Sequence, residues 1–420
     1  MQILFLTHYF PPEGNAPASR VYQICKRWVR AGHVVTVITC APNHPNGVVY
    51  EGYKNSLYQT QFIDGIRTIR IWTYLAANEG RIRRIGSFLS YLASATLAGL
   101  FIKQPDVVIA TSPQFFCGWA GVFVGWLRCK PFILEIRDLW PETISAVGAI
   151  GNPRILRILE WMEQRLYAAA KHIVAVGVGY KDKLVEKNVA PHNITVITNG
   201  ADLDFFEPRE PDAELTERYG LKNRFVCAYV GTIGMCAGLE VVLRAARTFK
   251  EMGDDRFRFL LVGDGAEKSL LEHEAREQGL DNIIFSGRQP KELMPNFISI
   301  ADVCLIHLKK LELFRTVLPS KIFEAMAMAK PVILGVEGNA AELVCDANAG
   351  ICVEPENEQE IVAAIKHLAG EDHLASRFGR NGRKYVINYF NRDTLADDYL
   401  KLINQISAGS NKICLMHLKK

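Results

Sequence analysis

The sequence predicts an α/β protein with two doubly wound domains, each a parallel β-sheet covered by helices on both faces. Short β-branched apolar runs alternate with helical patterns throughout the chain, which indicates parallel strands buried on both sides. The chain has 420 residues, too many for a single hydrophobic core. A polar stretch divides the runs into two series, and each series begins with a strand, a glycine-containing loop and a helix.

The first series predicts an N-terminal domain over residues 1–200. Its apolar runs, in chain order, are ILFLT, HVVTVITC, DVVIAT, PFILEI, HIVAV and ITVIT. The helix after the first run is expected to start near Pro17, because proline suits the first helical position.

The second series predicts a further domain over residues 201–390. Its runs are FVCAYVG, FRFLLVG, NIIFSG, DVCLIHL, PVILGV and GICVE. The polar, proline-bearing segment 199–223 marks the boundary, and residues 391–420 are expected to form a helix that crosses back towards the N-terminal domain and a tail. Parallel sheets bind ligands at the carboxyl ends of their strands, so we expect the site in a cleft between the two domains.

Composition excludes several classes of protein. A net charge of +4 without a concentrated basic face argues against a nucleic-acid partner. The ten cysteines form no CxxC pair, and several lie in apolar runs, which is typical of reduced, cytosolic thiols. The N-terminal MQILFLTHYF lacks the basic region and cleavage site of a signal peptide.

No motif indicates a bound cofactor or metal. The glycine loops do not spell GxGxxG with an acidic residue about 20 positions on, and GxxxxGK[ST] is absent. No His, Cys or Asp cluster has metal-ligand spacing, and Asp202 and Asp204 lie in the interdomain linker, where we interpret them as turn residues. We therefore expect no cofactor and no metal.

One apolar stretch, residues 87–102, follows the basic residues Arg81, Arg83 and Arg84. It is shorter than the roughly 20 residues that span a bilayer. A basic flank before an apolar helix is typical of an interfacial membrane anchor, whereas a buried helix packed on a sheet would show the same apolar run. Both interpretations stay open from the sequence.

Three glycine turns that follow predicted strands are candidates for phosphate binding. Gly14 and Asn15 precede the first helix, Gly231 and Thr232 follow the first strand of the second domain, and Gly338, Asn339 and Ala340 open a later helix. Small residues leave backbone N–H groups of such turns accessible to an anion. Ordinary turn chemistry explains a glycine at a strand end equally well.

The segment LPSKIFEAMAMAKPVI places two charged residues on an otherwise apolar helix. Lys321 and Glu324 are three residues apart near the helix N-terminus, so their side chains are neighbours. A cation and an acceptor at that position could hold a phosphate and a hydroxyl. The alternative is a solvated ion pair of little energetic consequence.

The segment EIRDLWPE follows a predicted buried strand and gathers charges of both signs around Trp140. Arg137 and Asp138 are the candidate catalytic residues, with Glu135 and Glu142 beside them, because the carboxyl end of a parallel strand is where such sheets bind ligands. The alternative is an interlocked surface turn.

Taken together, VITNGADLDFFEP, LLVGDGAEK, IIFSGRQPKELM and PSKIFEAMAMAKPVI resemble the family 4 glycosyltransferases, over nearly the whole chain. The family has the two-domain GT-B fold. FPPEGNAPASR and IRDLWPE are similar to the branch that builds bacterial O-antigen and exopolysaccharide units, and within it to N-acetyl-L-fucosamine transferases.

The resemblance implies roles for individual residues. Glu324 would bind the ribose hydroxyls of a sugar nucleotide, because a carboxylate offers acceptors to a vicinal diol. Lys321 would face the diphosphate, and the turn at Gly338 would donate backbone N–H groups. Arg288 matches the region that holds the base, and Gly14 matches the loop that closes over the diphosphate.

Three positions depart from the family pattern. Thr316 stands where the family has the first of two glutamates, and Thr232 and Ala237 replace the usual arginine and lysine of the glycine loop. Arg137 and Asp138 follow the strand where many members have a histidine. These departures affect the family's donor-sugar, diphosphate and catalytic contacts.

The resemblance implies a metal-independent, retaining glycosyltransferase that moves a sugar from a nucleotide diphosphate, UDP in the first instance, to a polyprenyl-diphosphate-linked saccharide. Asp138 would orient or deprotonate the acceptor hydroxyl, and Ser19 and Arg20 would contact the acceptor. We expect a cytoplasmic protein held peripherally at the anionic inner face of the cell membrane. The rivals are a nucleotide-sugar 2-epimerase of the same fold and a non-catalytic subunit that binds nucleotide sugar.

Overall fold

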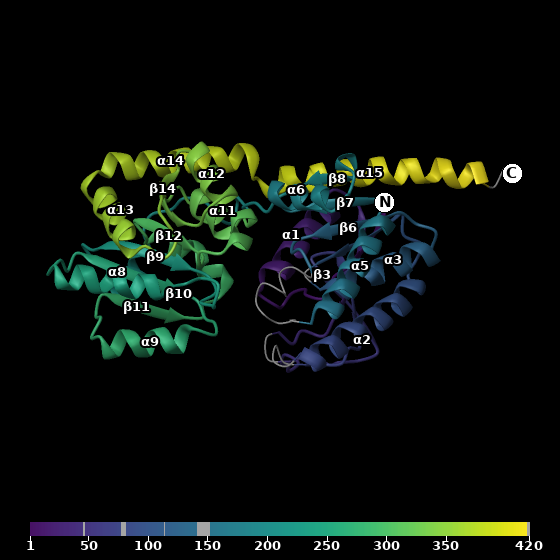
Figure 1. The fold of residues 1–420 in the computed structure, drawn as a ribbon, viewed down its shortest axis with the longest axis horizontal. Coiled ribbons are helices and arrows are strands. Elements are labelled where there is room, and N and C mark those ends of the chain that lie inside the picture. The colour runs from purple at the N-terminus through teal and green to yellow at the C-terminus, as the bar shows by residue number, and fades with distance from the viewer. Residues whose placement is uncertain (45–46, 77–80, 113, 141–151, 418–420) are drawn as a thin grey trace. The chain divides into compact units, whose positions relative to one another are not determined.

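The computed structural model describes the chain except for residues 45–46, 77–80, 113, 141–151 and 418–420 (Figure 1). The chain forms two compact units. Unit 1 comprises Met1–Thr198 and Asp393–Lys420, and unit 2 comprises Asn199–Arg392.

The described part of unit 1 contains an eight-stranded sheet in the order β3-β4-β2-β1-β5-β6-β7-β8. Its strands are β1 Gln2–Leu6, β2 Val34–Cys40, β3 Tyr58–Ile63, β4 Ile66–Ile71, β5 Val107–Thr111, β6 Phe132–Ile136, β7 His172–Ala175 and β8 Ile194–Val196. All neighbours pair in parallel except β3 and β4.

The antiparallel hairpin β3–β4 is the part of unit 1 that the apolar pattern did not reveal. Its strand β3 alternates exposed and half-buried side chains. The turn between the strands consists of Asp64 and Gly65, both with positive φ. An Asp-Gly pair between two alternating runs is a strong hairpin signal, so the sequence did contain the information.

Both faces of the unit 1 sheet are covered by helices. These are α1 Ala16–Arg30, α2 Arg81–Leu100, α3 Phe115–Leu127, α5 Pro153–Ala169, α6 Val178–Glu186 and α15 Arg392–His417, with a 3-10 turn at Pro191–Asn193 (Figure 1). In β1, Leu4 and Leu6 belong to a core cluster that includes residues of α2, α3, α5 and α6, whereas Ile3 and Phe5 belong to a second cluster with residues of α1 and α15. Alternate residues of one buried strand thus serve both layers.

The C-terminal helix α15 belongs to the core of unit 1. Tyr399 is fully buried and its ring meets that of Trp28 edge-on at 5.2 Å. The indole Nε1 of Trp28 donates a hydrogen bond to the carbonyl of Ala396 at 3.0 Å. The last segment of unit 1 therefore follows unit 2 along the sequence.

The described part of unit 2 contains a six-stranded parallel sheet in the order β11-β10-β9-β12-β13-β14. Its strands are β9 Phe225–Val230, β10 Phe257–Val262, β11 Ile283–Gly287, β12 Val303–His307, β13 Val332–Gly335 and β14 Gly350–Cys352. Each of the six predicted runs of the second series forms one of these strands.

Helices cover both faces of this sheet too. They are α7 Ala213–Arg218, α8 Glu240–Glu251, α9 Lys268–Glu277, α10 Met294–Ser299, α11 Ser320–Ala327, α12 Asn339–Asp346, α13 Glu358–Gly370 and α14 Asp372–Tyr389, with 3-10 turns at Lys291–Leu293 and Glu312–Thr316. Both units are thus doubly wound α/β structures, as the sequence predicts.

Candidate active site

In unit 2, the candidate donor site lies at the carboxyl edge of the sheet. Because all six strands run in parallel, the loops that follow β9, β12 and β13 share this edge. The N-terminus of α11 carries Lys321 and Glu324 in its first turns.

Lys321 reaches beneath the glycine turn that follows β9. A Cβ atom on Gly231 would lie 2.2 Å from Cε of Lys321, and Gly231 has a φ of 143°, so glycine is needed for both reasons. The ammonium group donates to the hydroxyl of Tyr229. Its removal from water lowers the pKa of Lys321 to about 7, which the nearby carboxylate of Glu324 opposes.

Glu324 is half-buried beside this lysine. In the part of the chain that the structure describes, no group donates a hydrogen bond to its carboxylate. Burial raises the pKa of Glu324, while the positive charges of Arg392, Lys291 and Lys321 oppose the shift. Lys321 and Glu324 line a pocket with about 250 Å³ of empty space, its open mouth included. A carboxylate that accepts no hydrogen bond from the described residues is available to a ligand's hydroxyl groups.

The turn at Gly338 lies against the segment that leads into α11. Its φ is 70°, and a Cβ atom there would be 2.2 Å from the carbonyl oxygen of Arg315, so only glycine fits. Among the described residues, no side chain caps the N-terminus of α12, and Nδ2 of Asn339 donates to the carboxylate of Glu342 at 3.3 Å. Ala340 is fully buried. The first backbone N–H groups of α12 are therefore available to an anion.

Arg288 and Thr232 lie at the same edge and are exposed. Arg288 follows the edge strand β11, which β10 separates from β9, so the two strands are about 10 Å apart. Thr316, which replaces a family glutamate, donates its hydroxyl to the carbonyl of Leu313 at 3.3 Å. The structure thus groups Gly231, Lys321 and Glu324, with Arg288 further along the edge.

His307 is a residue whose role the sequence did not reveal. It is buried at the end of β12, and its Nδ1 donates to the carbonyl of Ala237 at 2.6 Å. Its Nε2 accepts from the backbone N–H of Glu356 at 2.8 Å. This neutral tautomer links the glycine loop after β9 to the segment after β14.

In unit 1, the loop with Gly14 is held by a buried carboxylate. Glu13 accepts backbone N–H groups from Phe10 at 3.3 Å and from Asn43 and His44 at 3.0 Å. Asn15 caps α1, because its side chain accepts the N–H of Ala18 at 2.9 Å. Gly14 itself is exposed, and a Cβ atom there would meet nothing within 4 Å. Its surroundings leave space for a ligand.

The side chain of Arg20 is bonded to other residues of unit 1. It is buried, forms an ion pair with the fully buried Glu135 at 3.2 Å, and donates to the carbonyls of Ile197 at 2.8 Å and Thr198 at 2.7 Å. Glu135 also accepts the hydroxyl of Thr111 at 2.9 Å. These bonds connect α1 to β6 and to the end of β8, which the sequence did not indicate. The expected contact of Arg20 with an acceptor stays a prediction, as does that of the half-buried Ser19.

Arg137 and Asp138 follow β6 at the carboxyl edge of the unit 1 sheet. Ser112 fixes this turn, since its hydroxyl oxygen accepts the N–H of Arg137 at 2.7 Å and of Asp138 at 3.2 Å. Burial raises the pKa of Asp138 to about 6, against the effect of Arg137. Burial also lowers the pKa of Arg137 to about 10. A carboxyl group with a pKa near neutrality is suited to proton transfer.

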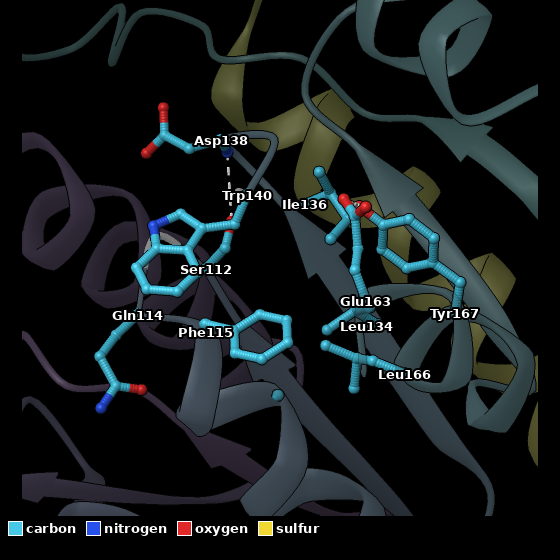
Figure 2. A pocket seen from close by; sticks show the side chains of 11 residues that line it. Ser112, Gln114, Phe115, Leu134, Ile136, Asp138, Trp140, Glu163, Leu166 and Tyr167 are labelled. Atoms are coloured by element: carbon cyan, nitrogen blue, oxygen red, sulfur yellow. Dashed lines mark hydrogen bonds between the residues drawn. The ribbon is translucent and has the colours of Figure 1, made fainter. Parts of the chain in front are cut away.

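A pocket opens beside Asp138, between β6 and the helices α3 and α5 (Figure 2). It has about 310 Å³ of empty space, including its mouth. The rings of Phe115 and Trp140 stack with centroids 5.2 Å apart, and Glu163 accepts the hydroxyl of Tyr167 at 2.5 Å. The lining residues are Ser112, Gln114, Phe115, Gly118, Leu134, Ile136, Asp138, Trp140, Glu163, Leu166 and Tyr167. A mostly apolar pocket with a few polar groups is typical of small-molecule sites.

Some predicted positions lie outside the described residues, namely Glu142 and the side chains of Arg81 and Arg84. The side chain of Arg83 is exposed. Among the helices of the described residues, none is long and apolar enough to cross a membrane. The same residues contain no group of three or more His, Cys, Asp or Glu side chains that could hold a metal ion.

The chain is similar to two named glycosyltransferases of bacteria. WcaI of Escherichia coli K12, named for colanic acid biosynthesis, is 26% identical over 379 residues, which are 87% of this chain and 91% of WcaI. CapM of Staphylococcus aureus, named for capsular polysaccharide biosynthesis, is 23% identical over 381 residues, which are 89% of this chain and 96% of CapM.

Solved structures share the fold over nearly the whole chain. Sucrose-phosphate synthase of Thermosynechococcus elongatus has a TM-score of 0.76 at 19% identity and covers 97% of this chain and 99% of its own. Anabaena HepE in complex with UDP-glucose has a TM-score of 0.71 at 17% identity, with 96% and 100% covered.

Two family models match consecutive parts of the chain. The glycosyl transferase 4-like domain matches residues 15–200, and the glycosyl transferases group 1 model matches residues 212–385. The first match lies in unit 1 except for residues 199–200, and the second match lies within unit 2. The two models together account for most of the chain, which therefore consists of a glycosyl transferase 4-like domain followed by a glycosyl transferases group 1 domain and has the GT-B fold.

Proposed function

We propose that the protein transfers a sugar from a nucleotide diphosphate to a saccharide acceptor in bacterial polysaccharide synthesis. The observation that supports this most directly is that Lys321 and Glu324 line the same pocket in unit 2, with Lys321 against the glycine turn at Gly231. The pocket offers a lysine and a carboxylate that accepts no hydrogen bond from the described residues, and the N-terminus of α12 at the same edge of the sheet offers backbone N–H groups. These match a diphosphate and a ribose diol.

UDP is the nucleotide that we propose first. HepE, which has the same fold, was solved with UDP and with UDP-glucose. Departure of UDP from the sugar builds negative charge on the β-phosphate. Lys321 and the N-terminus of α12 would stabilise this charge without a metal ion, and the sugar would keep its anomeric configuration.

The acceptor side of the reaction is assigned to unit 1. Asp138, with its pKa raised towards neutrality, would accept a hydrogen bond or a proton from the acceptor hydroxyl. Arg137 beside it would partly offset the charge of this carboxylate. By the resemblance to the O-antigen branch, the acceptor is a polyprenyl-diphosphate-linked saccharide and the donor sugar is N-acetyl-L-fucosamine.

We propose that the protein acts at the cytoplasmic face of the cell membrane, where a polyprenyl-linked acceptor resides. Helix α2 supports this, because only one of its faces is in the core. Tyr91 and Ala95 are fully buried, whereas Ile85, Leu89 and Leu97 are 45%, 45% and 59% exposed. An exposed apolar stripe after a basic segment is typical of interfacial helices.

The test combines binding with turnover. Calorimetry of the full chain with UDP, GDP and dTDP identifies the base, and a panel of UDP-sugars incubated with membranes that carry lipid-linked saccharides measures transfer. We expect UDP to bind and radiolabelled sugar to enter the lipid fraction. Release of an epimerised UDP-sugar without acceptor would favour the 2-epimerase, and UDP binding without turnover on any acceptor would favour a non-catalytic subunit.

A further inference from the structure

His8 lies at the point of the unit 1 sheet where doubly wound proteins bind ligands. It follows β1 at the carboxyl edge, and β1 is the neighbour of β5. The connection through α1 packs on one face of the sheet, and those through α2, α3, α5 and α6 pack on the other. The direction of winding therefore reverses between β1 and β5, which defines the switch point of the sheet.

The imidazole of His8 is enclosed by aromatic rings and has no hydrogen-bond partner among the residues that the structure describes. The residue is 6% exposed. Its ring meets those of Tyr9, Phe88 and Tyr91 edge-on, with centroids 5.0, 5.7 and 5.2 Å away. Within the described part of the chain Nδ1 is shielded from solvent and unpaired, whereas Nε2 is also unpaired but keeps some contact with solvent.

The backbone at this position is fixed although the ring is unpaired. The carbonyl of His8 accepts the hydroxyl of Thr39 and the thiol of Cys40, both at 3.1 Å. The ring is therefore held in place by packing and by its backbone, and neither ring nitrogen bonds to a group of the described residues. Burial lowers the pKa of His8 to about 4, with a smaller effect of His44, so the ring is neutral at physiological pH.

An unpaired buried nitrogen lowers stability, so its presence needs an explanation. A buried polar atom without a partner costs about 1–3 kcal/mol, whereas a phenylalanine among the same rings would not bear this cost. Here the buried atom is Nδ1, and a histidine that bears this cost is explained by a role of its other nitrogen, Nε2, which keeps contact with solvent and can reach a ligand. A neutral imidazole accepts a hydrogen bond from a hydroxyl group, and edge-on aromatic rings are compatible with the C–H face of a sugar.

We propose that His8 is a binding residue for the acceptor saccharide, whose hydroxyl donates a hydrogen bond to Nε2. This inference rests on the proposed function and adds a residue to its acceptor side. One strand, β5, separates β1 from β6, so His8 and Asp138 begin about 10 Å apart along the carboxyl edge. The two residues can therefore contact different hydroxyl groups of one acceptor.

The experiment compares His8→Phe and His8→Gln with the wild type and with His192→Phe, which changes an exposed histidine of the same unit. The probes are glucose and N-acetylglucosamine at millimolar concentration, observed by saturation-transfer NMR on the full chain with saturating UDP. We expect H8F to unfold at the wild-type temperature or above it and to lose the saccharide signal several-fold. H8Q should retain part of the signal, and H192F should match the wild type.

Three outcomes would contradict the role of His8. The first is a saccharide signal in H8F equal to that of the wild type. The second is a loss of signal in H8F that is accompanied by a lowered unfolding temperature, because His8 would then be a structural residue. Absence of a signal from the wild type itself would count against it as well. Calorimetry with UDP separates this inference from the proposed function, because failure to bind UDP contradicts the donor site without involving His8.

Discussion

The ammonium group of Lys321 lies 3.9 Å from the centre of the Tyr229 ring, beneath the backbone of Gly231. This position removes the group from water, which lowers its pKa to about 7. In the free protein the lysine is therefore largely neutral at pH 8. The arrival of a diphosphate would favour the charged form, so donor binding and protonation are coupled.

We predict that UDP binding takes up a proton between pH 7 and pH 9. The bound state needs charged Lys321, so affinity should be highest below pH 7 and fall as the pH rises above it. Calorimetry in buffers of different ionisation enthalpy measures the uptake directly. Lys321→Met should bind UDP more weakly and without this uptake, and the same proton uptake in K321M would assign the effect to another group.

The same lysine makes folding depend on pH. Its pKa in the folded protein lies below the ordinary value of 10.5, so the unfolded chain binds more protons between about pH 7 and pH 10. This group therefore contributes a stability that rises with pH across that window. K321M should remove the contribution, which chemical denaturation at pH 7 and pH 9 can detect as a smaller difference between the two pH values.

Removing the carboxylate of Glu324 should weaken UDP binding. A hydrogen bond to a charged acceptor contributes about 1.5–3 kcal/mol, so Glu324→Ala should raise the Kd by about 10- to 150-fold. Glu312→Ala is the matched control, because Glu312 forms an exposed i,i+3 ion pair with Arg315. The ribose role also predicts that 2′-deoxy-UDP binds the wild type more weakly than UDP does, and that E324A does not discriminate between them. Unchanged UDP affinity in E324A would exclude this role.

The apolar pattern predicted the strands better than it predicted the contacts of the site. Continuous runs such as the one in β12 are visible in the sequence because burial on both faces demands them. Strand β3 was missed because its face alternates and its partner β4 is antiparallel. Only its Asp64–Gly65 turn marked it.

The contacts of the site depend on pairs that are distant in sequence. Lys321 and Tyr229 are separated by 92 positions, and Arg20 and Glu135 by 115. Their proximity follows from the order of strands in the sheets, which local periodicity does not encode. This is why Lys321 and Glu324 could be named from the helix pattern, whereas His8 and the structural role of Arg20 could not.

We predict that the rate of sugar transfer increases as the pH is raised through about 6. Asp138 has a pKa of about 6, and its ionised form is the one that accepts a proton or hydrogen bond from the acceptor. The rate constant at saturating donor should therefore increase as the carboxyl group ionises. Asp138→Asn should lower the rate and remove this increase, while UDP affinity stays unchanged. If the rate of Asp138→Asn still increases with pH around pH 6, another group is responsible for the pH dependence.

Transfer activity should survive an excess of chelator. Asp202 lies in a turn, where its carbonyl accepts the N–H of Phe206 at 2.8 Å, and no metal-binding cluster is found among the described residues. The charge of the leaving diphosphate would be offset by Lys321 and by the backbone N–H groups at the start of α12. The assay with EDTA in large excess over any trace metal checks this. Loss of activity that a divalent ion restores would contradict it.

The last prediction concerns the basic residues at the start of α2, namely Arg81, Arg83 and Arg84. Each basic residue near an anionic bilayer contributes about 1 kcal/mol, so three contribute roughly 3 kcal/mol before the apolar side chains insert. The charge effect is screened over about 8 Å at physiological salt. We expect the wild type to co-sediment with anionic vesicles at low salt and to be partly released at high salt. The variant with all three arginines changed to Glu should stay in the supernatant.

A matched control changes three exposed basic residues of α14, Arg377, Arg380 and Lys384, to Glu. This control alters the net charge equally and should leave binding at the wild-type level. Leu89→Ser with Leu97→Ser tests the apolar stripe and should reduce binding that persists at high salt. If both charge variants sediment alike, net charge alone drives binding, and α2 is then only a helix of the core.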